Sequence, residues 1–135
     1  MLKTIHQSVT LPAPADVLFD MYLDPAQHAA FTGAPVTIGA APGAEFRAFN
    51  SMLSGRILHV VPQRLIVQLW RSVHFRPEDL DSTLILTFSP TGEHAGCIDL
   101  VHVNVSDVDY EAVREGWTTY YWTPWRQYLE RPQRP

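Results

Sequence analysis

The stretch YEAVREGWTTYYWTPWRQYL, residues 110–129, decides the fold of this chain. It holds three of the four tryptophans, and its large rings recur with the spacing of one helical face. The residues on that face are Trp117, Tyr120, Tyr121, Pro124, Trp125 and Tyr128. A stripe of rings with polar tips suits a helix that lies on a concave sheet and lines any space left there. The stripe therefore predicts a long C-terminal helix packed against a sheet.

Two local features shape this predicted helix. Ser106 followed by Asp109 three residues later resembles a capping box, so the helix should begin near Asp107. Pro124 removes a backbone hydrogen bond to the carbonyl of Tyr120, which costs about 3 kcal/mol when nothing compensates. We therefore expect a kink near residues 121–124, with the helix resuming after it.

The N-terminal third predicts one strand followed by two short helices. The strand ends at Pro12, and Pro14 is placed for the first turn of a helix whose apolar face includes Leu18 and Met21. The pair Asp24-Pro25 combines a cap residue with a proline at the first helical position. A second helix should therefore run to about residue 31 and end at the glycine that follows.

The middle of the chain reads as strands separated by turns, with Ser54-Gly55 taken as a turn or bulge. The expected strands are Val36–Ile38, Glu45–Leu53, Arg56–Val61, Leu65–Ser72, Thr83–Phe88 and Cys97–Val105. In the last two strands, alternation with a period of two predicts one inward face. That face consists of Leu84, Leu86 and Phe88 on one strand and Ile98, Leu100, His102 and Asn104 on the other.

These elements predict an α+β fold. Residues 1–135 should form a single domain in which a curved antiparallel sheet of about six to seven strands wraps around a long C-terminal α-helix, with two short helices after the first strand. A sheet with one covered face needs a helix to cover it, and the ring-striped helix is the candidate.

Composition excludes several classes of function. A net charge of −4 and a pI of about 5.8 give no electrostatic footprint for nucleic acid. No stretch reaches the ~20 apolar residues of a membrane span, and the N-terminus lacks the order of a signal peptide. The single cysteine, Cys97, allows no disulfide within the chain. Together these features lead us to expect a cytoplasmic protein that does not bind membranes.

Several local strings carry a family resemblance through their order and spacing. They are Ala30-Phe31-Thr32, Ala34-Pro35, Ser54-Gly55, Val61-Pro62, Ile66-Val67, Trp70-Arg71, Leu86-Thr87-Phe88, Gly116-Trp117 and Tyr120-Tyr121. Together they span about residues 9–128. In these strings the chain resembles the helix-grip superfamily, also called START or SRPBCC, and within it the C-terminal domain of the activator of the ninety-kilodalton heat-shock protein's ATPase. The resemblance implies a helix-grip fold and, at the level of lineage, a co-chaperone role.

No catalytic or metal-binding motif accompanies this resemblance. The sequence has no G-x-S-x-G, no glycine-rich phosphate loop and no H-E-x-x-H, and no histidine pair has metal-ligand spacing. We therefore expect no metal, no cofactor and no catalytic residue, although some members of the superfamily are enzymes. Of three hypotheses for the function, a cryptic enzyme that uses His102 with a tyrosine therefore ranks third, after the two that follow.

The first hypothesis is a non-enzymatic protein that binds a small apolar or aromatic ligand between the sheet and the C-terminal helix. The residues expected to line the cavity are Gln68, Trp70, His102, Trp117, Tyr120 and Tyr121. Each has a plainer alternative, because large rings are often core and a buried histidine or amide is often held by backbone or a tyrosine hydroxyl. The second hypothesis is a protein-interaction module acting on the chaperone. The chain could be a monomer or a homodimer.

Overall fold

The computed structural model describes residues 2–132, in which seven strands form one antiparallel sheet and the helices lie on one of its faces. The strands are β1 (Leu2–Leu11), β2 (Val36–Thr37), β3 (Glu45–Ala48), β4 (Leu53–Val61), β5 (Leu65–Ser72), β6 (Ser82–Pro90) and β7 (Gly96–Ser106). The helices are α1 (Ala15–Leu23), α2 (Pro25–Thr32), α3 (Tyr110–Gly116), a π-helical turn η1 (Trp117–Trp122) and α4 (Thr123–Glu130). Within this part of the chain no helix is both long and apolar enough to cross a membrane.

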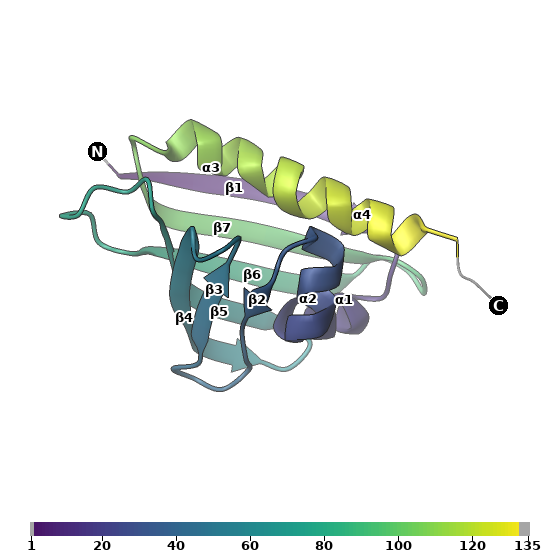
Figure 1. The fold of residues 1–135 in the computed structure, drawn as a ribbon. Coiled ribbons are helices and arrows are strands. Elements are labelled where there is room, and N and C mark those ends of the chain that lie inside the picture. Colours follow the sequence, from purple (N-terminus) through teal and green to yellow (C-terminus); the bar gives the residue numbers. More distant parts are fainter. Residues whose placement is uncertain (1, 133–135) are drawn as a thin grey trace.

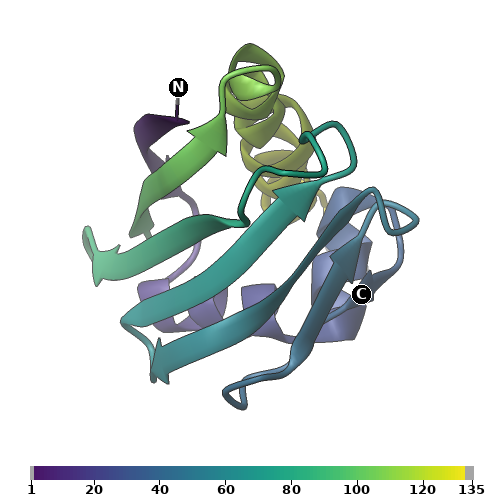
Figure 2. The same cartoon turned by 90° about the vertical axis from the view of Figure 1, so that its left-hand side faces the viewer.

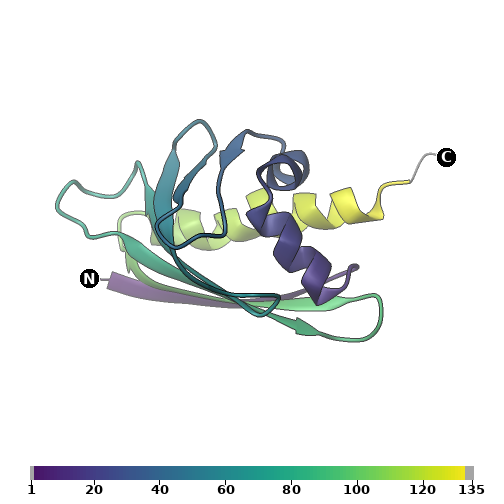
Figure 3. The same ribbon diagram turned by 90° about the horizontal axis from the view of Figure 1, so that it is seen from below.

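The sheet is curved and holds the C-terminal helical rod on its concave side. Its strand order is β1-β7-β6-β5-β4-β3-β2, so β1 crosses over to pair with the last strand. Figure 1 shows α3, η1 and α4 as one rod along the sheet, and the end-on view in Figure 2 shows the strands curving beneath it. Helices α1 and α2 lie on the same face, beside the end of the rod (Figure 3). The predicted helix-grip architecture is therefore confirmed.

The predicted cap of the second short helix is also confirmed. The Asp24 carboxylate accepts the backbone N–H of Ala26 at 3.0 Å, and Pro25 is the first helical residue. Gly33 ends the helix with φ of 80°, in the left-handed region that favours glycine. These local signals fix where the chain turns back toward the sheet.

Alternation along β6 and β7 places the core as expected, with one exception. Leu84, Leu86 and Leu100 are almost fully buried. Asn104, predicted to face inward, is exposed, and its φ is 62°. A bulge at this point sets two residues of β7 against one of β1, which shifts the alternation and turns Val105 into the core.

The prediction of a turn or bulge at Ser54-Gly55 was wrong, because both residues lie inside β4 and pair in regular register with β3 and β5. The turn between β3 and β4 instead covers residues 49–52. Gly55 is needed for close packing: a Cβ there would lie 1.8 Å from the carbonyl oxygen of Leu69 on β5. The glycine therefore marks a close approach of two strands.

The C-terminal helix begins at Tyr110, later than predicted, and without the capping box. The Ser106 hydroxyl donates a hydrogen bond to the Asp79 carboxylate at 2.6 Å, so it is not the helix cap. Only the backbone N–H of Asp109 returns to the Ser106 carbonyl, at 3.1 Å. The Ser106 side chain instead connects the end of β7 to the loop between β5 and β6.

The predicted irregularity before Pro124 takes the form of the π-helical turn η1. The backbone N–H of Thr123 bonds to the carbonyl of Thr118, five residues back, just before the proline that cannot donate. This wider turn changes the angular spacing of the rings. Trp122, outside the predicted stripe, is buried, whereas Tyr120 is 57% exposed.

Candidate functional site

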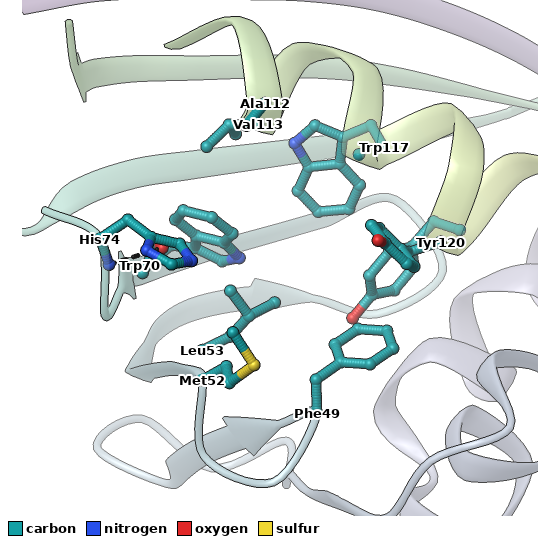
Figure 4. Close-up of a pocket in the computed structure, with 12 residues that line it drawn as sticks. Phe49, Met52, Leu53, Trp70, His74, Ala112, Val113, Trp117 and Tyr120 are labelled. Carbon is teal, nitrogen blue, oxygen red and sulfur yellow. Dashed lines mark hydrogen bonds between the residues drawn. The ribbon is translucent and has the colours of Figure 1, made fainter. Parts of the chain in front are cut away.

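A cavity of about 140 Å³ lies between the rod, β5 and the turn that joins β3 to β4 (Figure 4). Its lining is almost wholly apolar and contains no Asp, Glu, Lys or Arg. The lining residues are Phe49, Met52, Leu53, Trp70, Ser72, His74, Ala112, Val113, Gly116, Trp117, Tyr120 and Tyr121. The ring-striped helix thus meets the sheet with space remaining beside β5.

The cavity has a buried floor and an exposed mouth. Trp70, Trp117 and Tyr121 are each at least nine-tenths buried and form the floor. Met52 and Tyr120 are 46% and 57% exposed, so they stand at the mouth. A molecule entering there would exchange water for aromatic and aliphatic surface.

An unusual turn builds one wall of the cavity. Phe49, Asn50 and Ser51 follow one another with φ values of 52°, 57° and 65°, a left-handed conformation that is rare for residues other than glycine. The backbone N–H of Val73 bonds to the Met52 carbonyl at 3.0 Å, which ties the turn to the end of β5. The ring of Phe49 then meets Tyr120 edge-on, with centroids 5.6 Å apart.

His102 lies behind the floor and links Trp117 to Ser82 through hydrogen bonds to both of its ring nitrogens. The indole N–H of Trp117 donates to Nδ1 of His102 at 3.3 Å, and Nε2 contacts the Ser82 hydroxyl at 2.8 Å. Because that hydroxyl donates to the Trp70 carbonyl, the Nε2–H of His102 must donate to Ser82. Burial lowers the pKa of His102 to about 3, so the ring is neutral. Both ring nitrogens are occupied, which favours a structural role.

A second buried histidine, His28, holds Tyr121 in place. Its Nδ1–H donates to the Tyr22 carbonyl at 2.7 Å, and Nε2 accepts the Tyr121 hydroxyl at 2.8 Å. Burial lowers the pKa of His28 to about 4, and burial also raises the pKa of both Tyr22 and Tyr121. The floor of the cavity is therefore fixed by neutral, hydrogen-bonded groups.

The structure brings four of the six predicted site residues to the cavity. Those four are Trp70, Trp117, Tyr120 and Tyr121. His102 and Gln68 do not line it. Gln68 is fully buried in the core, where its Oε1 accepts the Tyr22 hydroxyl at 2.6 Å.

Sequence reasoning missed the wall at residues 49–53 and the support from His28. The wall was hidden because the turn was placed five residues too late, at Ser54-Gly55. His28 gave one usable signal, since it follows the Asp24-Pro25 cap on a short helix whose other buried residue is Phe31. A histidine on the buried face of a helix needs polar partners.

The lining of the cavity supplies mainly aromatic and aliphatic surface. The two histidines with lowered pKa already use both ring nitrogens in the protein's own hydrogen bonds. In residues 2–132 no group of three or more His, Cys, Asp or Glu side chains is placed to hold a metal ion. The geometry therefore offers mainly apolar contact, with the exposed imidazole of His74 as the only histidine side chain in the lining.

Comparison with known proteins agrees with this fold. The family model described as activator of Hsp90 ATPase homolog 1-like protein matches residues 12–130. The Homo sapiens activator of 90 kDa heat shock protein ATPase homolog 1 is 34% identical over 93 residues, which cover 68% of this chain and 27% of that protein. An uncharacterised Schizosaccharomyces pombe protein is 29% identical over 113 residues, covering 76% of this chain and 34% of that protein.

The chain thus spans about a third or less of the curated relatives it matches. Among solved structures, an HSP90 activator from Plasmodium falciparum superposes with a TM-score of 0.85 at 20% identity, over 97% of this chain and 99% of that one. The family model covers most of the chain, and the solved structure shares its architecture. The chain belongs to the family of activator of Hsp90 ATPase homolog 1-like proteins.

Proposed function

We propose that this chain binds a small, uncharged apolar or aromatic molecule in the cavity between the rod and β5, and that it does so without catalysing a reaction. The observation that carries the proposal is the apolar cavity itself, with its floor of Trp70, Trp117 and Tyr121. A small apolar molecule that enters through the mouth would remove the surface of these rings from water, which favours binding.

Size and charge narrow the class of ligand. An engineered cavity of about 150 Å³ in another protein stays dry and binds benzene, so a cavity of about 140 Å³ suits a single substituted ring. An anion or cation would lose its hydration without gaining an Asp, Glu, Lys or Arg partner in the lining. We therefore expect neutral single-ring compounds to bind and their carboxylates to be rejected.

A larger hollow beside β1 is a weaker candidate for such a ligand. It measures about 730 Å³ and is bordered by residues of β1, η1 and α4, most of them polar, together with Val9 and the buried Trp122. Arg126 of α4 already closes part of it by donating to the Thr10 carbonyl. This hollow has one buried ring, Trp122, among mostly polar neighbours, whereas the first cavity has a floor of three buried rings.

The test uses toluene as the probe and one added ring as the perturbation. Ala112 lies at an exposed position of α3 and lines the cavity, so Ala112→Phe should fill it at little cost to folding. Glu115→Phe adds the same ring to the same helix away from the cavity. We expect toluene to raise the Tm of the wild type and of Glu115→Phe, and to leave Ala112→Phe unchanged. An unchanged Tm in all three proteins would refute the proposal.

A second candidate function is regulation of the Hsp90 chaperone. Its support is membership of the family and the name of the human relative, an activator of the chaperone's ATPase. The loop between β5 and β6 and the loop between β7 and α3 offer a contact surface. On these loops Leu80 is 76% exposed and Val108 is 53% exposed. The ion pair between Arg76 and Asp107, at 3.1 Å, joins these loops.

This candidate is tested by adding the chain to the Hsp90 of its own organism and measuring ATP hydrolysis. We expect stimulation that is lost in the double variant Leu80→Ser with Val108→Ser and retained in Ala112→Phe. Those variants separate a surface function from a cavity function, because the cavity lining includes neither Leu80 nor Val108. No stimulation by the wild type would end this candidate.

A further inference from the structure

We propose that the ligand of this cavity carries an uncharged hydrogen-bond acceptor, which receives the indole N–H of Trp70. This inference rests on the proposed ligand-binding function and adds a specificity-determining residue to it. The class of ligand becomes a single aromatic ring that bears a carbonyl or an equivalent neutral acceptor. A hydrocarbon of the same shape should lack the interaction.

The first observation is that Trp70 Nε1 is buried and has no hydrogen-bond partner among the described residues. Trp70 is only 4% exposed, and its ring forms part of the cavity floor. Figure 4 draws the nitrogen at the end of the ring that faces the space between Leu53 and Trp117. A buried donor without a partner is destabilising, so an acceptor supplied from the cavity would be bound favourably.

The polar groups of the other two floor residues are already engaged. Trp117 Nε1 donates to His102, and the Tyr121 hydroxyl donates to His28. The Ser72 hydroxyl accepts the backbone N–H of His74 at 3.1 Å. Among the three floor residues, Trp70, Trp117 and Tyr121, Trp70 is therefore the one with a donor left over, and the hydrogen of the Ser72 hydroxyl is a second donor in the lining. The nitrogens Gln68 Nε2 and Trp125 Nε1 are also buried without partners, but neither residue lines the cavity.

The position of the nitrogen explains why the acceptor must belong to a ligand that enters deeply. Trp70 Nε1 has almost no exposed surface, so an acceptor reaches it only after a small tilt of the indole. The ring of Trp70 meets His102 edge-on, with ring centroids 4.7 Å apart. It is tilted relative to the ring of Trp117, with centroids 6.4 Å apart, so aromatic contacts set its resting orientation. Binding an acceptor would exchange part of that packing for a hydrogen bond.

The experiment compares acetophenone with α-methylstyrene, which has the same shape with a methylene group in place of the carbonyl oxygen. Both are titrated into the wild type and into Trp70→Phe, which keeps an aromatic ring and removes the donor. Because each compound is compared with itself in the two proteins, its own hydration cancels. We expect Trp70→Phe to weaken acetophenone about tenfold more than it weakens α-methylstyrene, or about 1.4 kcal/mol of coupling.

An NMR measurement on the wild type keeps the test independent of how well the variant folds. With ¹⁵N-labelled tryptophan, acetophenone should move the Trp70 indole proton resonance downfield, and α-methylstyrene should not. If both compounds bind with no such difference and no coupling, the inference is wrong while the proposed function stands. If neither compound binds the folded wild type, the proposed function fails and the inference fails with it.

Discussion

Acidification should destabilise this protein steeply, because two buried histidines are held neutral. Burial lowers the pKa of His28 to about 4 and that of His102 to about 3, from an ordinary value of 6.5. Below pH 6.5 the unfolded chain therefore protonates both histidines, whereas the folded chain keeps them neutral. Stability from these groups is fully present above pH 6.5 and is lost as the pH falls toward the folded pKa values.

The size of the effect follows from the two lowered pKa values. Each histidine contributes about 1.4 kcal/mol per pH unit within its window, so the pair removes about 5 kcal/mol between pH 6.5 and 4.5. That is a large share of a typical unfolding free energy of about 5–15 kcal/mol. The lowered pKa values of Asp79 and Asp107 act at lower pH, because an unfolded carboxyl titrates near 3.8.

The assay is urea unfolding followed by tryptophan fluorescence at several pH values between 7 and 4.5. His28→Gln should lower stability at pH 7 and roughly halve the slope, because one titrating group is gone. His94→Gln is the matched control, since the side chain of His94 is 94% exposed, and its slope should equal that of the wild type. A loss below about 1 kcal/mol across this range in the wild type would refute the account of both histidines.

Three paired substitutions test the backbone and packing, each by urea unfolding at pH 7. Gly55→Ala should lower the free energy of unfolding by more than about 3 kcal/mol or prevent folding, because its Cβ meets a backbone oxygen of the next strand. Gly33→Ala faces open space and should lower it by only about 1–2 kcal/mol, because of the positive φ. Trp125→Ala should cost about 3–5 kcal/mol because the ring is fully buried, and Tyr120→Ala under about 1 kcal/mol because it is exposed. Asn104→Val should lower the free energy of unfolding by about 1–2 kcal/mol, because the φ of this residue is 62°, and Asn104→Gly should be nearly neutral. Equal effects within any of the three pairs would contradict the cause given for that pair.

Much of the fold could be predicted because regular periodicity and burial agree over long stretches. The period of two placed Leu84 and Leu86 in the core, and the ring stripe placed Trp117 and Trp125 on the buried side of the helix. Alternation failed at Asn104, where a residue with positive φ adds a bulge that no glycine announces. Sequence alone does not show where a strand takes an extra residue, because the bulge depends on pairing with a distant strand.

The candidate site was partly predictable for a related reason. The helix and β5 supplied Trp70 and Tyr121 through simple periodicity. The opposite wall depends on Phe49, whose left-handed backbone is not signalled by glycine. The exposure of Tyr120 depends on the π-helical turn, which a regular helical spacing cannot anticipate. Tertiary pairing and one irregular helical turn therefore decided which side chains meet at the cavity.

The central claim is that the cavity between the rod and β5 accepts an apolar ring. It is tested most directly by a crystal structure of the protein soaked with bromobenzene, in which the bromine gives an anomalous signal. The account predicts a peak among Leu53, Trp70 and Trp117. A cavity that stays empty at a saturating bromobenzene concentration, or that is filled by its own side chains in the crystal, would contradict it.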